Sequence, residues 1–235
     1  MKTSAVRLRL AGSGEVLEVD GTLIIAGYTG SDTEQVKAHI EELAAIGVPP
    51  PEEVPMLYPV DWSLLTTAPS ITVAGPGTSG EVEPVLVRHS GAWYLGVGSD
   101  HTDRDLERES VHESKKACPK PMAPEVIALG VDPAAGEFDE AWGAISLASA
   151  VDGVDYQRGS LSAIRVPSDL LPRVLMIVGP REDLVVFCGT VPVIGGQLRP
   201  GQRFECRLAV PGRDPVSLAY TTSTEAPAAR SSAGS

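Results

Sequence analysis

The sequence predicts an α+β fold that is mainly β. Short runs of Val, Ile and Leu recur between glycines and prolines, which number 24 and 20 among 235 residues. That mixture is typical of many short strands joined by tight turns. One segment near the amino terminus has instead the apolar period of a helix. We therefore expect one large, sheet-dominated fold with a single clear amphipathic helix.

Paired strands are expected at the start of the chain. Between residues 5 and 25, Val6, Leu8 and Leu10 alternate with polar neighbours, and Asp20-Gly21 supplies a turn before the next apolar run. Side chains that alternate in this way face opposite sides of a strand. The segment therefore predicts strands with one buried face.

The helix is expected over residues 32–46, where apolar residues recur at helical spacing. Ser31 or Asp32 can cap its start, because a side-chain oxygen there accepts a hydrogen bond from a main-chain N–H of the first turn. Gly47 can end it. The prolines that follow force an extended connection.

Further strands are expected at residues 70–73, 82–87, 93–98, 175–178, 184–188 and 204–210. The polar stretch 99–120 is typical of a loop with one helical turn. Residues 137–147 are ambiguous and fit a strand, and a short helix can open at 168–171. The small polar residues 221–235 are expected to be a disordered tail.

The acidic balance of the chain limits its partners. The net charge is −12, and lysine and arginine form no block, so the surface repels phosphate backbones and anionic lipid. We expect neither a nucleic-acid partner nor a membrane role. The cysteines form no CxxC pair, and no stretch reads as a membrane span or a signal peptide. These features favour a cytoplasmic location.

Acidic residues supply the first candidate site. Glu81 and Glu83 are two apart, so on a strand they point to the same face. Adjacent carboxylates repel each other unless a cation or a proton lies between them. Asp100, directly after an apolar run, could complete an oxygen-rich site for Mg²⁺, Mn²⁺ or Ca²⁺. The alternatives without a ligand are that the two glutamates lie on a solvated strand edge and that Asp100 belongs to a turn.

Two further pairs can carry chemistry. His39 and Glu42 are three apart on the expected helix, where a carboxylate can hold an imidazole that takes a proton from water. Gly189 and Thr190 follow a strand and offer a main-chain N–H and a hydroxyl to a carboxylate or an oxyanion. Each pair has a structural alternative: an exposed helix face for the first and a turn for the second.

In their order along the chain, these segments resemble the motifs of the fumarylacetoacetate-hydrolase superfamily. The matching segments are Gly27-Tyr28, His39-Ile40-Glu41-Glu42, Glu81-Val82-Glu83, Asp100-His101-Thr102-Asp103-Arg104-Asp105, Lys115-Lys116-Ala117-Cys118-Pro119, Gln157-Arg158-Gly159-Ser160, Cys188-Gly189-Thr190-Val191-Pro192 and Leu198-Arg199-Pro200-Gly201. The likeness runs from about residue 27 to residue 210. Glu107 is a departure, because many relatives have Gln there.

The resemblance implies a mixed β-sheet roll like that of the family's carboxyl-terminal domain, assembled as a homodimer. The roles it implies are cation binding (Mg²⁺, or Mn²⁺ or Ca²⁺) for Glu81, Glu83 and Asp100, water activation for His39 and Glu42, charge balance for Lys115 or Lys116, and substrate contact for Arg104, Gly189 and Thr190. The expected organisation is strands over residues 1–26, a catalytic domain over 27–220 and the tail over 221–235.

The resemblance also implies an activity on a small 2-oxo or diketo acid. A metal-dependent hydrolase would cleave a C–C bond in an acylpyruvate or a related 1,3-diketo acid through a metal-bound enolate. A decarboxylase, hydratase or isomerase acting on a 2-oxo acid would use the same enolate. A non-catalytic binding protein on the same fold is a further alternative.

Overall fold

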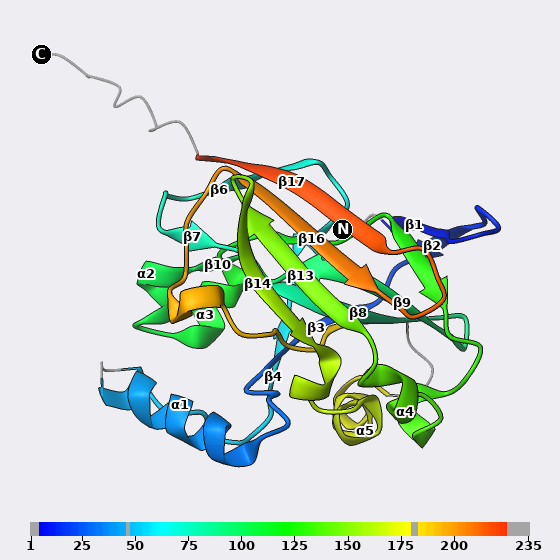
Figure 1. The fold of residues 1–235 in the computed structure, drawn as a ribbon, viewed down its shortest axis with the longest axis horizontal. Helices are drawn as coiled ribbons and strands as arrows, with labels where there is room; N and C mark the ends of the chain where they lie inside the picture. Colours follow the sequence, from blue (N-terminus) through cyan, green and yellow to red (C-terminus); the bar gives the residue numbers. More distant parts are fainter. Residues whose placement is uncertain (1–4, 46–47, 180–182, 225–235) are drawn as a thin grey trace, which may run out of the picture.

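The computed structural model describes residues 5–45, 48–179 and 183–224. Within helix α1 (Thr33–Ala45), the side chains of His39 and Leu43 lie outside the described set. Two β-sheets dominate the fold, and Figure 1 shows the long strands of one sheet crossing in front of the other.

The larger sheet has eight strands in the described ranges, in the order β2-β1-β12-β9-β8-β15-β3-β4. Its members are β1 (Val6–Leu10), β2 (Val16–Val19), β3 (Thr22–Gly27), β4 (Met56–Val60), β8 (Val82–His89), β9 (Ala92–Ser99), β12 (Glu125–Ala128) and β15 (Leu184–Phe187). β1 runs parallel to β12 and β3 runs parallel to β15, whereas the other neighbours are antiparallel. The expected mainly β, mixed-sheet fold is confirmed.

The first three strands do not form one continuous series of hairpins. β1 and β2 pair as expected, but β3 leaves them and pairs with β15 and β4. The Asp20-Gly21 turn therefore carries the chain to another part of the sheet. Glycine is required at position 21 because a side chain there would collide with the main chain of Asp183.

The second sheet has five strands where the structure describes the chain, in the order β14-β13-β16-β17-β6. Its members are β6 (Ser70–Val73), β13 (Ser146–Val151), β14 (Val154–Ser160), β16 (Arg203–Ala209) and β17 (Val216–Thr224). β17 continues into the segment expected to be a tail, and residues 221–224 pair with β6 in parallel. Two small pairs complete the strands, β5 (Leu65–Thr66) with β11 (Lys120–Pro121) and β7 (Thr78–Ser79) with β10 (Thr102–Asp103).

Both faces of the central strand β8 are covered, so nearly all of it is buried. Val82 and Leu86 face a core shared with the five-stranded sheet. Val85 and Val87 face a second core, which includes Tyr58 from β4. A polar side chain on this strand must therefore find its partners inside the protein.

The helices are α1, α2 (Arg104–Glu107), α3 (Val111–Lys116), α4 (Asp139–Trp142) and α5 (Pro167–Val178), with short 3₁₀ turns η1 (Trp62–Leu64), η2 (Pro133–Ala135), η3 (Leu161–Ala163) and η4 (Ile194–Gly196). The helix expected over residues 32–46 is confirmed as α1. Asp32 caps it by accepting hydrogen bonds from the main chains of Glu34 (3.0 Å) and Gln35 (3.1 Å). Its expected end at Gly47 lies outside the described residues.

The strand expected at residues 175–178 is wrong, because this segment is the end of α5. Pro167 begins the helix at a position where its missing N–H is harmless. Leu170, Leu171 and Val174 then lie buried at helical spacing. Four apolar residues taken alone cannot distinguish the end of a helix from a strand.

Two other segments also differ from expectation. Residues 137–147, which fit a strand, contain α4 and only then enter β13 at Ser146. The expected loop at 99–120 contains α2 and α3, each capped by the side chain of the residue before it, Asp103 and Ser110. These short helices carry residues of the site described below.

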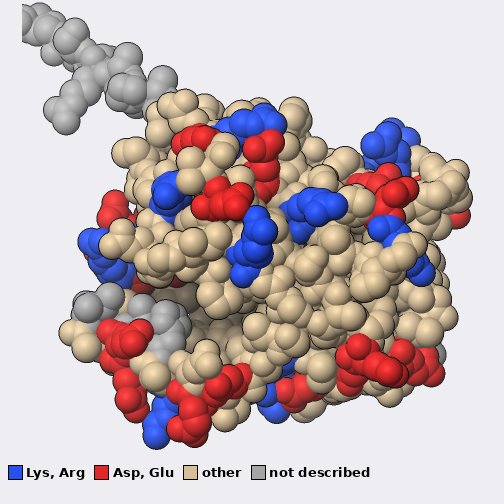
Figure 2. Space-filling model, in the orientation of Figure 1, with Lys and Arg blue, Asp and Glu red and all other residues tan. Residues whose placement is uncertain are grey.

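The surface seen in Figure 2 mixes acidic and basic side chains and is hollowed beside the segment of α1. No block of one sign covers this face. Among the described residues, no helix is both long and apolar enough to cross a membrane.

Candidate functional site

The β8–β9 hairpin brings the acidic residues together. Its register pairs Val82 with Ser99. One step further, Asp100 N donates to Glu81 O (2.9 Å) and Glu81 N donates to Asp100 O (3.3 Å). Facing residues of neighbouring strands, and residues two apart on one strand, share a face of the sheet. Glu81, Glu83 and Asp100 therefore lie on one face.

Two glycines let the main chain approach Glu83. Gly98 faces it across the hairpin, where a Cβ would lie 2.8 Å from Val85 Cγ2 and would also strike the ring of Phe187. Gly189 follows β15 with φ +104°, and its N–H donates to Glu83 Oε2 at 2.8 Å. This main-chain donor holds the buried carboxylate in place.

Two lysines neutralise Asp100, whose side chain is fully buried. Lys115 Nζ donates to Oδ2, and Lys120 Nζ lies 2.8 Å from Oδ1. Burial alone would raise the pKa of Asp100, but the two ammonium groups outweigh it and hold that pKa well below its usual range. Asp100 is therefore ionised at neutral pH.

The charges of all three acidic side chains act on Lys115. Burial disfavours its ammonium, but the charges of Asp100, Glu83 and Glu81 overcome that effect and raise the pKa of Lys115 above its ordinary value. The sequence left open whether Lys115 or Lys116 serves the site. Lys116 is exposed and pairs with Glu113 at 3.0 Å. The structure thus brings Lys115 to the carboxylates and leaves Lys116 outside.

Glu83 remains short of positive charge. Burial raises its pKa well above the ordinary value, the charge of Asp100 adds to the rise, and Lys115 and the Gly189 N–H only partly oppose it. A buried carboxylate in this state takes up either a proton or a cation.

A divalent cation fits this donor set. Glu81, Glu83 and Asp100 offer the oxygen ligands that Mg²⁺ and Ca²⁺ prefer. Asp100 Oδ1 is fully buried, and its charge partner there is the Lys120 ammonium at 2.8 Å. In the described part of the chain no three ligand side chains are already gathered as a metal site. The Lys115 ammonium is paired with Asp100 instead.

Arg104 is held within the protein. Its Nε donates to Ser79 Oγ (2.7 Å), Nη1 to Glu107 (2.9 Å) and Nη2 to Glu81 (3.0 Å). Burial would lower the pKa of Arg104, but Glu81 and Glu107 raise it. Each of the three nitrogens therefore has a protein partner. The sequence predicted that Arg104 contacts substrate, whereas in the structure its guanidinium positions Glu81.

Thr190 has a similar internal role. Its Oγ1 donates to Val82 O (2.8 Å) and accepts from Gln157 Nε2 (2.7 Å). Gln157 Oε1 in turn accepts from Val82 N at 2.9 Å. Because Val82 lies between Glu81 and Glu83, these bonds fix the strand that carries both carboxylates. The hydroxyl expected to contact substrate is used inside the fold.

Sequence reasoning missed Lys120 and misjudged His101. His101, expected as a loop residue, is fully buried, with Nδ1 2.9 Å from Tyr220 Oη and Nε2 2.9 Å from Thr78 Oγ1. Burial and the charge of Lys120 lower the pKa of His101 to about 3, so it is neutral. Lys120 donates to His101 O at 2.6 Å. The only sequence signal for Lys120 was its position between Pro119 and Pro121, and that position does not distinguish a buried lysine from an exposed one.

Aromatic side chains lie beside Lys115. The ring centroid of Tyr58 is 5.8 Å from Lys115 Nζ and 5.7 Å from that of His112. Tyr28 has a left-handed backbone (φ +56°), which is uncommon for a bulky residue and concentrates at functional sites. Burial raises the pKa of Tyr28, and the charges of Glu107 and Lys115 also act on it. These rings form one wall of the site.

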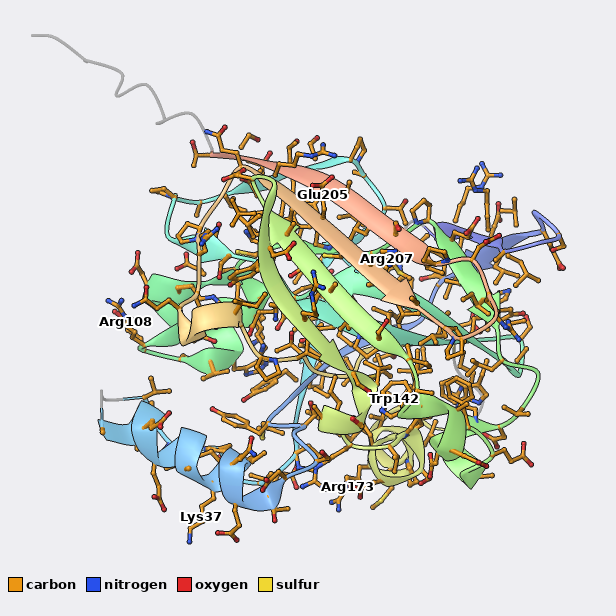
Figure 3. All side chains as sticks on the ribbon, viewed as in Figure 1. Lys37, Arg108, Trp142, Arg173, Glu205 and Arg207 are labelled. Carbon is orange, nitrogen blue, oxygen red and sulfur yellow. The ribbon has the colours of Figure 1, made fainter. Side chains whose placement is uncertain are left out.

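The expected water-activating pair lies on α1, which Figure 1 shows apart from the two sheets. Glu42 is exposed, and the side chain of His39 lies outside the described set. In Figure 3, Lys37 of the same helix points away from the sheets. The pair stays a prediction.

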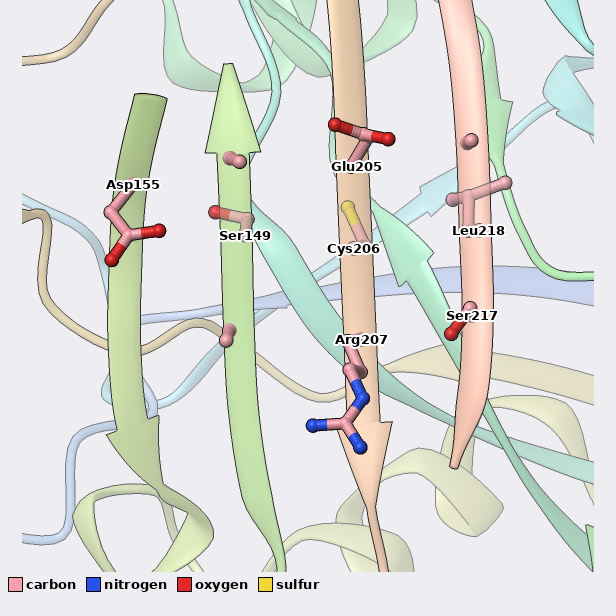
Figure 4. A pocket seen from close by; sticks show the side chains of 10 residues that line it. Ser149, Asp155, Glu205, Cys206, Arg207, Ser217 and Leu218 are labelled. Atoms are coloured by element: carbon pink, nitrogen blue, oxygen red, sulfur yellow. The ribbon is translucent and has the colours of Figure 1, made fainter. Parts of the chain in front are cut away.

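A groove of about 390 Å³ crosses the outer face of the five-stranded sheet. Figure 4 shows Asp155, Glu205 and Arg207 around it. Leu147 and Leu208 of the same strands point the other way, into the core. This groove is therefore separate from the buried acidic cluster.

Comparison with known sequences finds one family. A family model described as "Protein of unknown function (DUF2848)" matches residues 26–220. Among curated proteins, none matches the chain in sequence.

Solved structures share the fold at low sequence identity. A protein from Oleispira antarctica assigned as a fumarylacetoacetate isomerase/hydrolase is 18% identical, with a TM-score of 0.62 over 92% of this chain and 99% of that one. The 5-carboxymethyl-2-hydroxymuconate delta-isomerase of Mycobacterium smegmatis is 18% identical, with a TM-score of 0.55 over 91% and 87%. A 2-keto-3-deoxyarabinonate dehydratase is 15% identical, with a TM-score of 0.60 over 88% and 75%. The expected fumarylacetoacetate-hydrolase fold is thereby confirmed.

Proposed function

The chain belongs to the DUF2848 family and has the fumarylacetoacetate-hydrolase fold, and from this premise we propose that it is a divalent-metal-dependent hydrolase. Its substrate is an acylpyruvate or a related 1,3-diketo acid, in which it cleaves a C–C bond. The observation that carries the proposal is the convergence of Glu81, Glu83 and Asp100 on one face of the β8–β9 hairpin. Without a bound cation, the positive charge near Glu83 is too small to offset its burial and the charge of Asp100.

Glu81, Glu83 and Asp100 would hold the cation. When bound, a divalent cation supplies Lewis acidity that polarises a keto oxygen and stabilises a developing enolate. Arg104 orients Glu81, and the Gly189 N–H orients Glu83. Such support of the residues that bind a metal fixes their direction and is as necessary as the ligands.

The lysines and aromatic rings favour an anionic substrate. Lys115 lies beside Tyr58, so an acid that enters there meets an ammonium group and an apolar wall. Lys120 is fully buried behind Asp100 and serves to balance charge. In a site closed to water, such charges stabilise negative charge in the transition state.

The hydrolytic step is assigned to the pair on α1. His39, with Glu42 as its carboxylate partner, would take a proton from a water molecule that adds to the carbonyl carbon remote from the carboxylate. The C–C bond then breaks, its electron pair passes to the leaving carbon, and a proton returns to that carbon. The products are a carboxylic acid and pyruvate, or the corresponding 2-oxo acid.

A substrate panel tests the proposal. Purified protein is stripped of metal with EDTA, supplied with Mg²⁺ or Mn²⁺, and assayed for pyruvate release from acylpyruvates. We expect activity to depend on added metal and to fall at least about 100-fold in Glu83→Gln, because loss of a ligand should cost at least as much as the roughly 10- to 100-fold typical of a group that only supports the metal. Glu113→Gln, an exposed acid on α3, should retain activity. Metal-independent turnover, or full activity of Glu83→Gln, would refute the assignment.

A second candidate keeps the cation and changes the reaction. An isomerase and a dehydratase are among the proteins with this fold, and both fit a cluster that stabilises an enolate. His39→Ala should remove acylpyruvate hydrolysis and spare decarboxylation of oxaloacetate if the pair activates water. Equal loss of both would show that the assignment of the pair to water activation is wrong or incomplete. Turnover of a 2-oxo acid without acylpyruvate hydrolysis would move the proposal to this second class, and no turnover of any 2-oxo acid would favour a binding protein.

A further inference from the structure

A lysine ammonium lies where a divalent cation would bind. Lys115 Nζ donates to Asp100 Oδ2, and the Lys115 side chain is 8% exposed. Asp100 faces Glu81 across the hairpin, and Glu83 shares that face. One positive charge is thus already paired with Asp100, on the face of the hairpin that also carries Glu81 and Glu83.

We infer that Lys115 is an internal counter-ion that competes with the divalent cation for Asp100 and swings out of the cluster when the cation binds. The inference rests on the proposed function, which assigns a cation to these carboxylates. It adds that cation affinity in this protein is set partly by a residue that is not a ligand.

The competition follows from charge and space. An ammonium and a divalent cation bound to the same carboxylate would lie within a few ångströms of each other, and their repulsion is strong in a buried site. Oδ2 of Asp100 is taken by Lys115, and Oδ1 lies 2.8 Å from the Lys120 ammonium. Full access to Asp100 therefore requires one of the two lysines to move.

Lys115, rather than Lys120, is the residue free to leave. Lys120 is fully buried and is also tied to His101 O at 2.6 Å. Lys115 lies on the short helix α3, its side chain is 8% exposed whereas that of Lys120 is fully buried, and the Tyr58 ring lies 5.8 Å from its ammonium. The flexible four-carbon stem lets the ammonium leave Asp100, and the existing cation–π contact with that ring gives it a second partner.

Calorimetric titration with MgCl₂ and with MnCl₂ tests the inference on the full-length, metal-stripped chain. Lys115→Met keeps the length of the stem and removes the competing charge. We expect it to bind both cations at least about tenfold more tightly than the wild type, since a buried Asp100 that has lost one of its two ammonium partners gains more from a bound cation. Lys116→Met, the exposed neighbour on the same helix, should bind like the wild type.

The outcomes separate the two proposals. If the wild type and Lys115→Met bind cations equally, or Lys115→Met binds more weakly, the inference falls and the proposed metal site stands. If neither binds either cation, both fall. If Lys115→Met binds a cation and the wild type does not, Lys115 does compete with the cation, but the proposed metal-dependent function of the wild type falls.

Acylation of the wild type gives a test that requires no variant to fold. Lysines are labelled with acetic anhydride with and without saturating Mg²⁺, and each site is quantified by mass spectrometry. Lys115 should be protected without Mg²⁺ and should become several-fold more reactive with it, while Lys116 should react equally in both states. Continued protection of Lys115 in the Mg²⁺-saturated protein, or its ready labelling without Mg²⁺, would overturn the inference.

Discussion

Asp100 and Glu81 face each other at the open end of the β8–β9 hairpin, and their main chains exchange hydrogen bonds of 2.9 and 3.3 Å. The acidic cluster is thus built by strand register and not by a flexible loop. A one-residue slip would turn each side chain to the opposite face of the sheet. Substitutions of the groups that hold this register, or that neutralise the acidic cluster, should therefore change stability.

Asp100→Asn is expected to destabilise the protein as well as the site. The amide would leave Lys115 and Lys120 buried without their carboxylate, and breaking a buried ion pair costs about 3–5 kcal/mol. Urea unfolding at neutral pH measures the loss. Asp155→Asn, which breaks an exposed pair with Arg158, should change the free energy of unfolding by less than about 1 kcal/mol. Equal stability of the two variants would contradict this account of Asp100.

Glu83 should make the metal-free protein less stable as pH rises. The pKa of Glu83 is raised in the folded protein by burial and by Asp100, whereas an unfolded glutamate has a pKa near about 4.3. Between these two values the folded state binds more protons, so the stability due to this group is full below pH about 4.3 and is lost as pH rises through the folded pKa. The wild type should lose stability relative to Glu83→Gln over that window. Thermal unfolding of both proteins from pH 4 to pH 8 in EDTA measures the difference, and parallel curves would contradict the prediction.

Gln157→Leu should loosen the strand between the two glutamates. The amide accepts from Val82 N (2.9 Å) and donates to Thr190 Oγ1 (2.7 Å) and Val191 O (2.8 Å). Leucine would leave the buried Val82 N–H without a partner, which costs about 1–3 kcal/mol. Chemical unfolding should show this loss, and the same change at the exposed Gln202 should be nearly neutral. An unaltered Gln157→Leu protein would show that the amide does not hold the strand.

Gly98→Ala should disturb packing next to Glu83. The new methyl group would lie 2.8 Å from Val85 Cγ2 and against the Phe187 ring, and overpacking of this kind costs about 1–3 kcal/mol. The melting temperature should therefore fall. Gly75→Ala is the control, because a Cβ there meets nothing within 4 Å. Similar melting temperatures for the two variants would contradict the prediction, because they would mean that Phe187 and Val85 can move to make room for the methyl group at little cost.

Local pattern predicted much of this structure. The two-residue spacing of Glu81 and Glu83 gave their shared face, and the apolar run ahead of Asp100 placed it at the end of the facing strand. Asp32 marked the start of α1. Each of these features depends on the repeat of a strand or a helix and on nearest neighbours, which the sequence contains directly.

Only the tertiary structure decided which charged groups belong to the site. Lys115 and Lys116 are adjacent, yet one is buried on Asp100 and the other is exposed. Lys120 and Arg104 likewise acquired their roles from carboxylates on distant strands. The sequence determined several of the strands, the first helix and the shared face of Glu81 and Glu83, because periodicity is local. The ammonium and guanidinium groups that balance these carboxylates were decided by packing between distant segments, because the energy of a charge depends on its burial and its neighbours in space.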